Sequence, residues 1–566
     1  MPPKPPPDLS TIAHTVQQFT AMSINNFIPE IILVCGFLFS ILLDVAIRKS
    51  GDKRITMYFA IFVLALAGVV SATQWLTFEP GHLKDWKGGS PLFPYTQSLF
   101  APDVKNAEMT NGYGMAVVDN FSVFFKLIVS VSGIFVLLMS LASRELNARG
   151  KRFGEYASLI LGMSIGMYLM PASMDLITMY ISMELVSIAG YILAGFSKDA
   201  EHSAESSLKY ILFGALASGM MLYGFSLFYG LTGTTSIIGI RNVLALSPAT
   251  HTGANLYVLW SATALALVGM GYKISAVPFH FWTPDVYEGA PTPVTALLSV
   301  ASKAAGFGML IRFLIFIFPE GTAANIPLLN WSVLIGGLAA VTMTVGNFAA
   351  LLQSNVRRML AYSSIAHAGY MLAAVAVAGA SGVVAVMVYL ATYLFMQLGA
   401  FYAVMLIDNK IGTEEIDDYR GLASRSPLVC VALLVFLISL TGIPLSAGFI
   451  GKFYLFTALL TPEHTTHTIP WLWLAVVAIA NAIVALYYYL RVAGAMFLKR
   501  PLRDMALERA GEVSAIGPTA ISYGWSATIL LFAFIVPVLL LGVYFQPLVD
   551  FASGVVRFFS FNNIRY

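Results

Sequence analysis

The sequence predicts an all-α, polytopic membrane protein with about fourteen transmembrane helices, and three observations lead to this fold class. Of the 566 residues, 58% are hydrophobic and 11% are charged, which is too little charge to cover the surface of a soluble protein of this size. Apolar runs long enough to cross a bilayer recur along the whole chain. These runs are continuous and do not alternate with polar residues, which excludes a β-barrel.

Each predicted span is one apolar run bounded by polar, glycine or proline residues. In chain order the predicted spans are 26–47, 56–77, 119–142, 155–172, 174–196, 205–230, 255–282, 291–317, 328–352, 357–378, 380–407, 427–461, 470–498 and 524–547. The seventh and the twelfth are longer than a bilayer requires, and they contain Pro278 and Pro444.

The two prolines predict broken helices, because a proline within a helix removes one hydrogen bond and clashes with the carbonyl four residues before it. The seventh helix is expected to unwind beside the carbonyl of Ile274. In the twelfth helix, Thr441 and Gly442 are expected to absorb the bend. Lys452 lies eight residues after Pro444, about two turns into the following half-helix, so it is expected to reach this break through water and not by direct contact. A break of this kind frees backbone carbonyls and amides, which attract water into the midplane of the membrane.

The distribution of Lys and Arg predicts that both chain termini lie on the outer side of the membrane. With that orientation, 18 of the 32 Lys and Arg residues fall in inner segments and 7 in outer segments, and such residues are enriched in the loops that stay inside. The proline-rich residues 1–25 are expected to be disordered. The loop 78–118 and the segment 499–523 are the sizeable pieces expected outside the membrane.

Neither nucleotide-driven transport nor redox chemistry on this chain is indicated. The sequence contains no Walker phosphate-binding loop and no dinucleotide fingerprint that follows a strand. Cys35 and Cys430 lie in apolar runs and form no CxxC pair, so no cofactor and no metal ion is expected on this chain. The formal net charge of +3 gives no indication of a nucleic-acid partner.

A weak internal repeat relates the two broken helices. The first half of the chain contains GYKISAVP late in its length, and the second half contains TGIPLSAGFIGK late in its own. Two proline-interrupted helices at corresponding positions are typical of inverted-repeat transporters, in which the ion site lies at the breaks.

Four charged residues lie deep within predicted spans: Glu184, Lys273, Lys303 and Lys452. Each costs about 2.5–3.5 kcal/mol on insertion scales. One acid cannot pair with three lysines, and burial favours the neutral form of an unpaired lysine, which can then take up and release protons. We predict that these residues carry protons and that Glu184 and Lys273 lie within about 4–7 Å of each other, close enough to interact.

The other charges within spans have simpler interpretations. Lys126 and Arg312 are expected to extend toward the membrane surface with their charged ends. Arg491 is expected to make a packing or lipid-headgroup contact. Three acids lie near span ends, where a carboxylate can reach water: Glu30, Asp44 and Asp175.

Lys209 and two histidines complete the predicted proton path. Lys209 lies in the sixth span, His280 follows Lys273 by about two turns of an unbroken helix, and His367 lies between the last two deep lysines in sequence. Histidine titrates near neutral pH and suits a relay, although a lone histidine is more often a satisfied hydrogen-bonding group.

The chain resembles a known family in one long motif, GYKISAVPFHFWTPDVYEGAPTPV, which is similar to the seventh-helix signature of the antiporter-like subunits of respiratory complex I, relatives of Mrp sodium/proton antiporters. The resemblance extends over roughly residues 115–498 through SNVRRMLAYSSIAHAGYML, DYRGLASRSP and LTGIPLSAGFIGKFYLF. Lys452 stands where the subunit M family has a glutamate, and the chain ends one span after the second repeat, without the lateral helix of the subunit L family. The chain is therefore most similar to the subunit N family.

The resemblance implies a fold and a set of site residues. It implies two inverted five-helix repeats, over 155–317 and 328–498, with three helices in 26–154 before them and an inner linker and final helix in 499–566 after them. It also implies one proton channel, whose members by motif are Glu184 in MELVSIAGY, Lys209 in SSLKYILFG, Lys273 and His280 in GYKISAVPFH, Lys303 in ASKAAGFG and Lys452 in GFIGKFY.

The resulting hypothesis is a proton-translocating subunit of the membrane arm of an NADH:quinone oxidoreductase in a bacterial inner membrane. Closing of the Glu184–Lys273 pair would hold the proton, and opening would send it through Lys303 toward Lys452. The expected partners are subunit M-like and small K/J/A-like membrane-arm subunits, membrane lipids, protons and water. The alternative is a Mrp-type cation/proton antiporter subunit without a redox partner.

Overall fold

The computed structural model describes residues 26–47, 52–77, 115–147, 152–197, 201–246, 253–318, 330–461, 471–500 and 520–558. The predictions for residues 1–25, and for most of 78–118 and 499–523, lie outside these ranges. Within the ranges the regular elements are helices, and the β pairings are isolated bridges. The all-α prediction is confirmed.

In the described part of the chain, 13 helices are long and apolar enough to cross a membrane. They are α2 (Ile28–Ala46), α3 (Arg54–Thr77), α4 (Asn120–Ala142), α6 (Phe153–Leu169) with η2 (Met170–Ala172), α7 (Leu176–Ala194), α8 (Glu201–Thr232), α10 (Gly253–Ile274), α12 (Thr292–Leu297) continuing through η4 (Leu298–Ser302) into α13 (Lys303–Ile317), α14 (Trp331–Leu351), α15 (Val356–Ala376), α16 (Ala380–Ile411), α19 (Leu472–Leu498) and α21 (Trp525–Val543). Two shorter apolar helices, α17 (Pro427–Thr441) and α18 (Ala447–Leu460), together fill the predicted twelfth span. Every predicted span is therefore occupied.

The remaining helices are short. They are α5 (Arg144–Asn147), α9 (Ile237–Leu246), α11 (Trp282–Gly289), η6 (Ile416–Tyr419), η7 (Leu422–Ser424) and α22 (Gln546–Phe558).

The seventh span is broken around Pro278, as predicted. The helix α10 ends at Ile274, and α11 begins after a non-helical segment in which the Val277–Pro278 peptide bond is cis. The amide of Val277 donates to the hydroxyl of Thr342 in α14 over 3.0 Å. The break in the first half of the chain therefore packs directly against a helix of the second half.

The twelfth span is broken where Pro444 predicted a bend. The helix α17 ends at Thr441, and Gly442 follows in the left-handed region at φ 88°. Leu445 also has a positive φ, of 70°, before α18 begins. A residue with a side chain rarely adopts this conformation, so the turn is tightly constrained by its surroundings.

The eighth span is continuous but changes its winding in the middle. Leu298–Ser302 form a π-helix between α12 and α13, and Lys303 is the next residue. Short π-helical turns within α-helices are frequent at functional sites, because they displace one side chain from the regular helical register.

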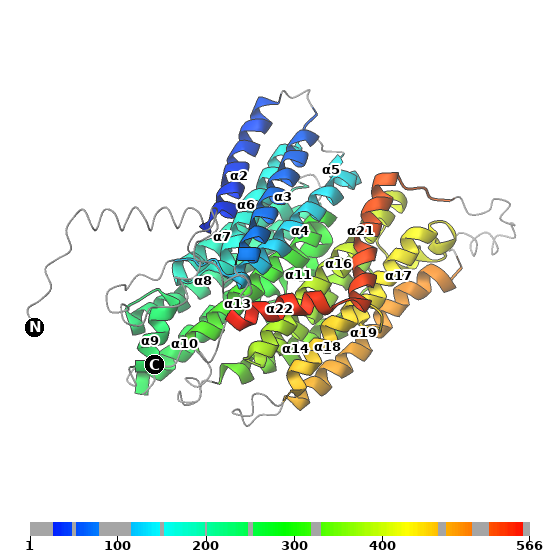
Figure 1. Ribbon diagram of the computed structural model, residues 1–566. Helices are drawn as coiled ribbons and strands as arrows, with labels where there is room; N and C mark the ends of the chain where they lie inside the picture. Colours follow the sequence, from blue (N-terminus) through cyan, green and yellow to red (C-terminus); the bar gives the residue numbers. More distant parts are fainter. Residues whose placement is uncertain are drawn as a thin grey trace, which may run out of the picture.

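Figure 1 shows the helices of the first half of the chain, in blue to green, on one side of the bundle and those of the second half, in yellow to orange, on the other.

Two glycines allow the especially close approach of α14 and α15, since an added Cβ at Gly346 or Gly369 would come within 2.6 Å of a backbone nitrogen of the facing helix. The long helix α16 contacts elements of both halves, including α4, η4, α15 and α18.

The helix α22 was not predicted. It lies transverse to the membrane helices, across the face of the bundle (Figure 1), and the ring of Phe551 stacks on Trp75 of α3 with centroids 3.6 Å apart. It has 13 residues and mixes apolar and polar side chains, so it does not register as a span.

Candidate functional site: a line of buried lysines

Three lysines of the predicted path are buried in the bundle without an acidic partner. The exposed fractions of Lys273, Lys303 and Lys452 are 1%, 0% and 4%. In the described part of the chain, no carboxylate oxygen lies within 4.0 Å of their ammonium nitrogens, and each Nζ donates to hydroxyl or carbonyl oxygens. Neutral acceptors solvate an ammonium group without fixing its charge.

Lys273 lies in the last turn of α10, directly before the break, and its Nζ donates to the hydroxyl of Ser187 in α7 over 3.2 Å. Glu184 lies one turn before Ser187 on the same helix. The carboxylate of Glu184 interacts electrostatically with Lys273, and its Oε1 atom is buried without a hydrogen-bond partner. The direct partner of the lysine is therefore Ser187, a residue that the sequence analysis missed.

Lys303 follows the π-helix, and its Nζ donates to the backbone carbonyl and the hydroxyl of Ser364 over 3.0 and 2.6 Å. The ammonium group also lies 5.9 Å from the ring centroid of Tyr287. One turn after Lys303, an added Cβ at Gly306 would lie 3.4 Å from Cγ of Lys273. The missing side chain at Gly306 thus allows the stem of Lys273 to pack against the helix that carries Lys303.

His367 is 2% exposed, and both of its ring nitrogens have tyrosine partners. Its Nδ1 lies 2.7 Å from the hydroxyl of Tyr389 in α16, and its Nε2 lies 3.3 Å from the hydroxyl of Tyr489 in α19. Both Lys303 and Lys452 act electrostatically on His367. The histidine therefore lies between the two lysines in space as well as in sequence.

Lys452 corrects one prediction. Its Nζ donates to the backbone carbonyls of Leu440 and Thr441 over 3.1 and 2.7 Å, whereas we expected it to reach the break only through water. That expectation counted residues along a straight helix, but the turn after Gly442 folds α18 back beside the end of α17. The carbonyls left without partners at the end of a helix are natural acceptors for a lysine.

One face of α15 joins these contacts. Ser364, His367 and Tyr370 follow one another at spacings of three residues, which places them on one side of the helix. Ser364 binds Lys303, and the ring of Tyr370 lies 4.9 Å from Nζ of Lys452. The motif SSIAHAGY therefore links the last two buried lysines, although the sequence analysis used only its histidine.

Lys209 is in a different environment. Its side chain is 36% exposed, and it pairs with Glu205 over 2.7 Å and with Asp285 over 2.6 Å. Asp285 also accepts from Arg358 over 2.7 Å, and Arg358 reaches Glu288 over 2.6 Å. Burial raises the pKa of Asp285, but the hydrogen bonds from Lys209 and Arg358 outweigh it, so the pKa lies below its usual range. This network ties α8, α11 and α15 together, and the sequence analysis missed its acids.

His280 is 7% exposed and lies in the non-helical turn between α10 and α11. Its Nδ1 is buried without a hydrogen-bond partner, and its ring lies 4.6 Å from that of Phe281. The count of two helical turns from Lys273 applies to an unbroken helix, and here α10 ends at Ile274, before His280.

The expectation that Lys126 and Arg312 extend to the membrane surface was also wrong. Both are 0% exposed. Lys126 pairs with Glu30 over 2.5 Å, and Arg312 makes two hydrogen bonds of 2.9 Å to Asp119. Each of these two charges is paired with an acid from another part of the bundle, so neither side chain has to extend to the membrane surface.

The acids near span ends and Arg491 also make specific protein contacts. Asp175 is 8% exposed and accepts from the amide of Ile177 and the hydroxyl of Thr235, which stabilises the start of α7. Asp44 pairs with Lys53 over 2.7 Å. Arg491 donates to the carbonyls of Leu351 and Gln353 at the end of α14, which is a contact within the protein, the first of the two expected kinds.

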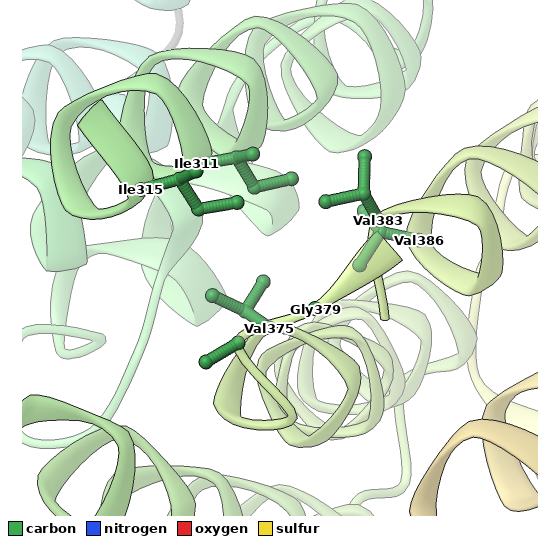
Figure 2. A pocket seen from close by; sticks show the side chains of 7 residues that line it. Ile311, Ile315, Val375, Gly379, Val383 and Val386 are labelled. Carbon is green, nitrogen blue, oxygen red and sulfur yellow. The ribbon is translucent and has the colours of Figure 1, made fainter. Parts of the chain in front are cut away.

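A small apolar pocket lies on α13, the helix that carries Lys303. Figure 2 shows its position between α13 and the connection of α15 to α16. It is lined by Ile311, Ile315, Val375, Ala378, Gly379, Val383 and Val386. Water in a protein interior needs polar partners, so this pocket does not extend the polar line.

In the described residues, no group of three or more His, Cys, Asp or Glu side chains could hold a metal ion. The lysines, hydroxyls and histidine described above form a chain of hydrogen-bonding groups, and such an arrangement can support proton exchange.

Comparison with known proteins places these features in a family. Residues 173–480 match the family described as "NADH:quinone oxidoreductase/Mrp antiporter, TM". The NADH-quinone oxidoreductase subunit N 2 of Chloroherpeton thalassium is 40% identical over 535 residues, 94% of both chains. Subunit N of an Anaeromyxobacter species is 38% identical over 542 residues, 94% of this chain and 96% of the relative.

Solved structures with a similar fold include a chain of respiratory complex I from Thermus thermophilus, at a TM-score of 0.67 and 29% identity, covering 93% of this chain and 100% of that one. A chain of the Mrp complex from a Dietzia species has a TM-score of 0.73 at 21% identity, covering 96% of this chain and 98% of that one, which shows a likeness of fold alone.

Proposed function

This chain belongs to the NADH:quinone oxidoreductase/Mrp antiporter family, in its subunit N branch, and from that premise we propose that it translocates protons in the membrane arm of an NADH:quinone oxidoreductase. The observation that carries the proposal is the line of three buried lysines whose partners are neutral oxygens. An ammonium group held by neutral oxygens in a membrane interior can lose its proton at modest cost, and a neighbouring group can accept it.

The proposed path has two segments. In the first, Glu184 and Lys273 control the first proton position at the break of the seventh span, with Ser187 as the direct acceptor of the ammonium group. Approach of Glu184 to the lysine favours the charged form, and separation favours release. Lys209 and His280 stay in the proposal as members of the path on its entry side.

In the second segment the proton passes from Lys303 to Lys452 along the polar face of α15. Ser364 contacts the first lysine, His367 lies between them, and Tyr370 packs on the second. Electron transfer in other subunits would supply the driving force, because this chain is proposed to hold no redox cofactor. The chain would thus act as one subunit of a translocating enzyme.

The proposed setting is the inner membrane of a bacterial cell, with both termini on the periplasmic side, as the bias of Lys and Arg indicates. We propose that its neighbours are subunit M-like and small K/J/A-like membrane-arm subunits, together with lipid.

We further propose that the five-helix units 155–317 and 328–498 are inverted repeats. In each unit the fourth helix is broken, as α10 and α11 in one and α17 and α18 in the other. A second correspondence supports the proposal. The cap residue of the second helix, Asp175 or Asn355, forms an isolated β-bridge to the segment after the third helix, at Ser236 or Glu415.

The alternative, a Mrp-type antiporter subunit without a redox partner, has less support. The similarity to the Mrp chain at 21% identity shows the fold, whereas relatives that cover nearly the whole chain at 38–40% identity are subunits N.

The test of the proposal is Lys273→Ala in the assembled complex, with proton pumping and quinone reduction measured together in vesicles. The expected result is normal assembly with pumping lost and quinone reduction slowed, because the first proton position is removed. Lys53→Ala, which removes a partly exposed lysine paired with Asp44, is the matched control and should pump normally. Full pumping by the assembled Lys273→Ala complex would refute the proposed role.

A further inference from the structure

Gln397 is a buried residue with a side-chain amide, and it has no role in the proton path proposed above. It lies in α16, its exposed fraction is 0%, and both Oε1 and Nε2 are buried without a hydrogen-bond partner among the described residues. Buried polar atoms in proteins nearly always have a partner, either in the protein or in ordered water, and one amide can donate twice and accept twice. Because neither the oxygen nor the nitrogen of the Gln397 amide has a protein partner among the described residues, ordered water is the expected ligand.

The position of Gln397 on its helix places it beside the second proton segment. Tyr389, Tyr393, Gln397 and Phe401 follow at spacings of four residues and share one side of α16. The first two contact His367, through the hydroxyl of Tyr389 at 2.7 Å and the ring of Tyr393 at 5.2 Å.

The other end of this face reaches the surroundings of Lys303. The ring of Phe401 lies 6.2 Å from that of Tyr287, and the ring of Tyr287 lies 5.9 Å from Nζ of Lys303. Gln397 lies one helical turn from Tyr393, which contacts His367, and one turn from Phe401, which leads through Tyr287 to Lys303. It therefore lies between the surroundings of His367 and those of Lys303.

Two further buried polar atoms lie in the same region. The hydroxyl groups of Tyr287 and Tyr393 are both buried, and neither has a partner at full hydrogen-bond geometry among the described residues. Both lie within loose hydrogen-bonding reach of the hydroxyl of Ser364, the acceptor of Lys303. Buried polar atoms from two helices, with hydrogen-bonding capacity left over, therefore lie beside the contact between Lys303 and Ser364.

We propose that Gln397 is a positioning residue for proton transfer, which with the hydroxyls of Tyr287 and Tyr393 orients water between Lys303 and His367. The ligand class is water, because the region offers a few donors and acceptors and no charge beyond the lysine. The amide does not itself exchange a proton; it holds the water that does, by donating to its oxygen or accepting from its hydrogen. This inference rests on the proposed transfer from Lys303 toward Lys452.

The experiment compares Gln397→Met with Gln397→Asn in the whole complex. Methionine has a similar length and cannot make the hydrogen bonds, whereas asparagine keeps the amide. We expect Gln397→Met to lower the rate of pumping about two- to tenfold, the rate equivalent of one lost hydrogen bond, with normal assembly and melting temperature. Gln397→Asn should restore at least part of the rate, which a merely structural filling of space would not do.

Two controls separate the possible failures. Gln74→Met removes another buried glutamine, whose amide donates to the carbonyl of Asn26 in another part of the bundle, and it should leave pumping unchanged. Lys303→Ala should abolish pumping; if it pumps normally, the proposed path itself is wrong. If Lys303→Ala fails and Gln397→Met pumps at the full rate, the path stands and only the role of Gln397 is overturned.

A high-resolution map of the wild-type complex gives an independent readout. We expect ordered water within hydrogen-bond distance of the Gln397 amide and of the Tyr393 hydroxyl. A dry contact, with the amide bonded only to protein groups, would overturn it, and so would equal rates of pumping in Gln397→Met and the wild type.

Discussion

The region of α2 and α4 and the region of α13, α15 and α18 both bury a lysine completely, but they treat its charge in opposite ways. Lys126 is paired with Glu30 over 2.5 Å, whereas Lys303 donates only to the carbonyl and hydroxyl of Ser364. A carboxylate fixes the ammonium form, because deprotonation would leave an unpaired buried anion. Neutral oxygens impose no such penalty. We therefore propose that burial alone does not identify a proton-carrying lysine, and that a buried lysine qualifies when no acid among the described residues is in direct contact with it.

The largest expected effect is on stability, and it comes from removing the acid of the Lys126–Glu30 pair. Glu30→Ala leaves the ammonium group of Lys126 buried and unpaired, which should destabilise the protein by about 3–5 kcal/mol and reduce assembly. The double variant Glu30→Leu/Lys126→Met should recover most of that loss. Thermal unfolding of the purified variants in detergent measures both. A Glu30→Ala protein as stable as the wild type would show that this pair does not hold its region together.

Gly442→Ala should have the next largest effect, because it acts on the turn that brings Lys452 to its acceptors. A Cβ at this position, with φ 88°, would lie 2.8 Å from Cδ of Lys452. The left-handed backbone strain alone costs about 1–3 kcal/mol, and displacement of the lysine should also lower pumping. Gly337→Ala, where an added Cβ meets nothing within 4 Å, is the matched control and should lose neither stability nor activity.

Lys303→Met tests the other region, in which the buried lysine contacts neutral oxygens and no acid. Since no acid is left unpaired, the free energy of unfolding should change by less than about 1 kcal/mol or increase, while pumping is lost. Melting temperature and pumping are measured in the same preparation. A loss of stability is expected in the region of Glu30 and Lys126, and a loss of pumping without a loss of stability is expected in the region of Lys303. A loss of stability as large as that expected for Glu30→Ala would mean that Lys303 is structural.

The smallest expected effect concerns Asp285 at the entry side. Its pKa lies below the usual range, after burial is outweighed by Lys209 and Arg358, so its ionised form stabilises the fold at neutral pH. That stability is present above the unfolded value and is lost as the pH falls through the lower, folded value, below about pH 4. The side chain is 26% exposed, so the contribution should stay below about 1 kcal/mol. Melting temperatures of wild type and Asp285→Asn should converge in acid; a difference that does not shrink there would contradict this assignment.

Much of the fold could be predicted from the sequence because hydropathy and proline act locally. The spans and the breaks at Ile274 and Thr441 follow from runs of apolar residues and from Pro278 and Pro444. The transverse helix α22 could not be predicted in this way, because a short helix with mixed polarity lacks the signal of a span.

The site was less predictable, because partners come from distant parts of the chain. The lysines could be selected by their depth in apolar runs, but nothing in the run around Lys126 indicates that Glu30, on another helix, will meet it. In the same way, Ser187 and Ser364 are ordinary helix residues in the sequence, and only packing places them on Lys273 and Lys303.

We propose that a fully buried lysine without a carboxylate in direct contact carries protons, whereas a fully buried lysine paired with an acid does not, and a charge-preserving substitution tests this most directly. Lys452→Arg keeps a positive charge but cannot release its proton at usable pH, while Lys126→Arg keeps the charge that pairs with Glu30. The measurement is the number of protons pumped per quinone reduced in vesicles that contain the assembled complexes. We predict that Lys452→Arg lowers this number and that Lys126→Arg leaves it unchanged. An unchanged number for Lys452→Arg would contradict the account.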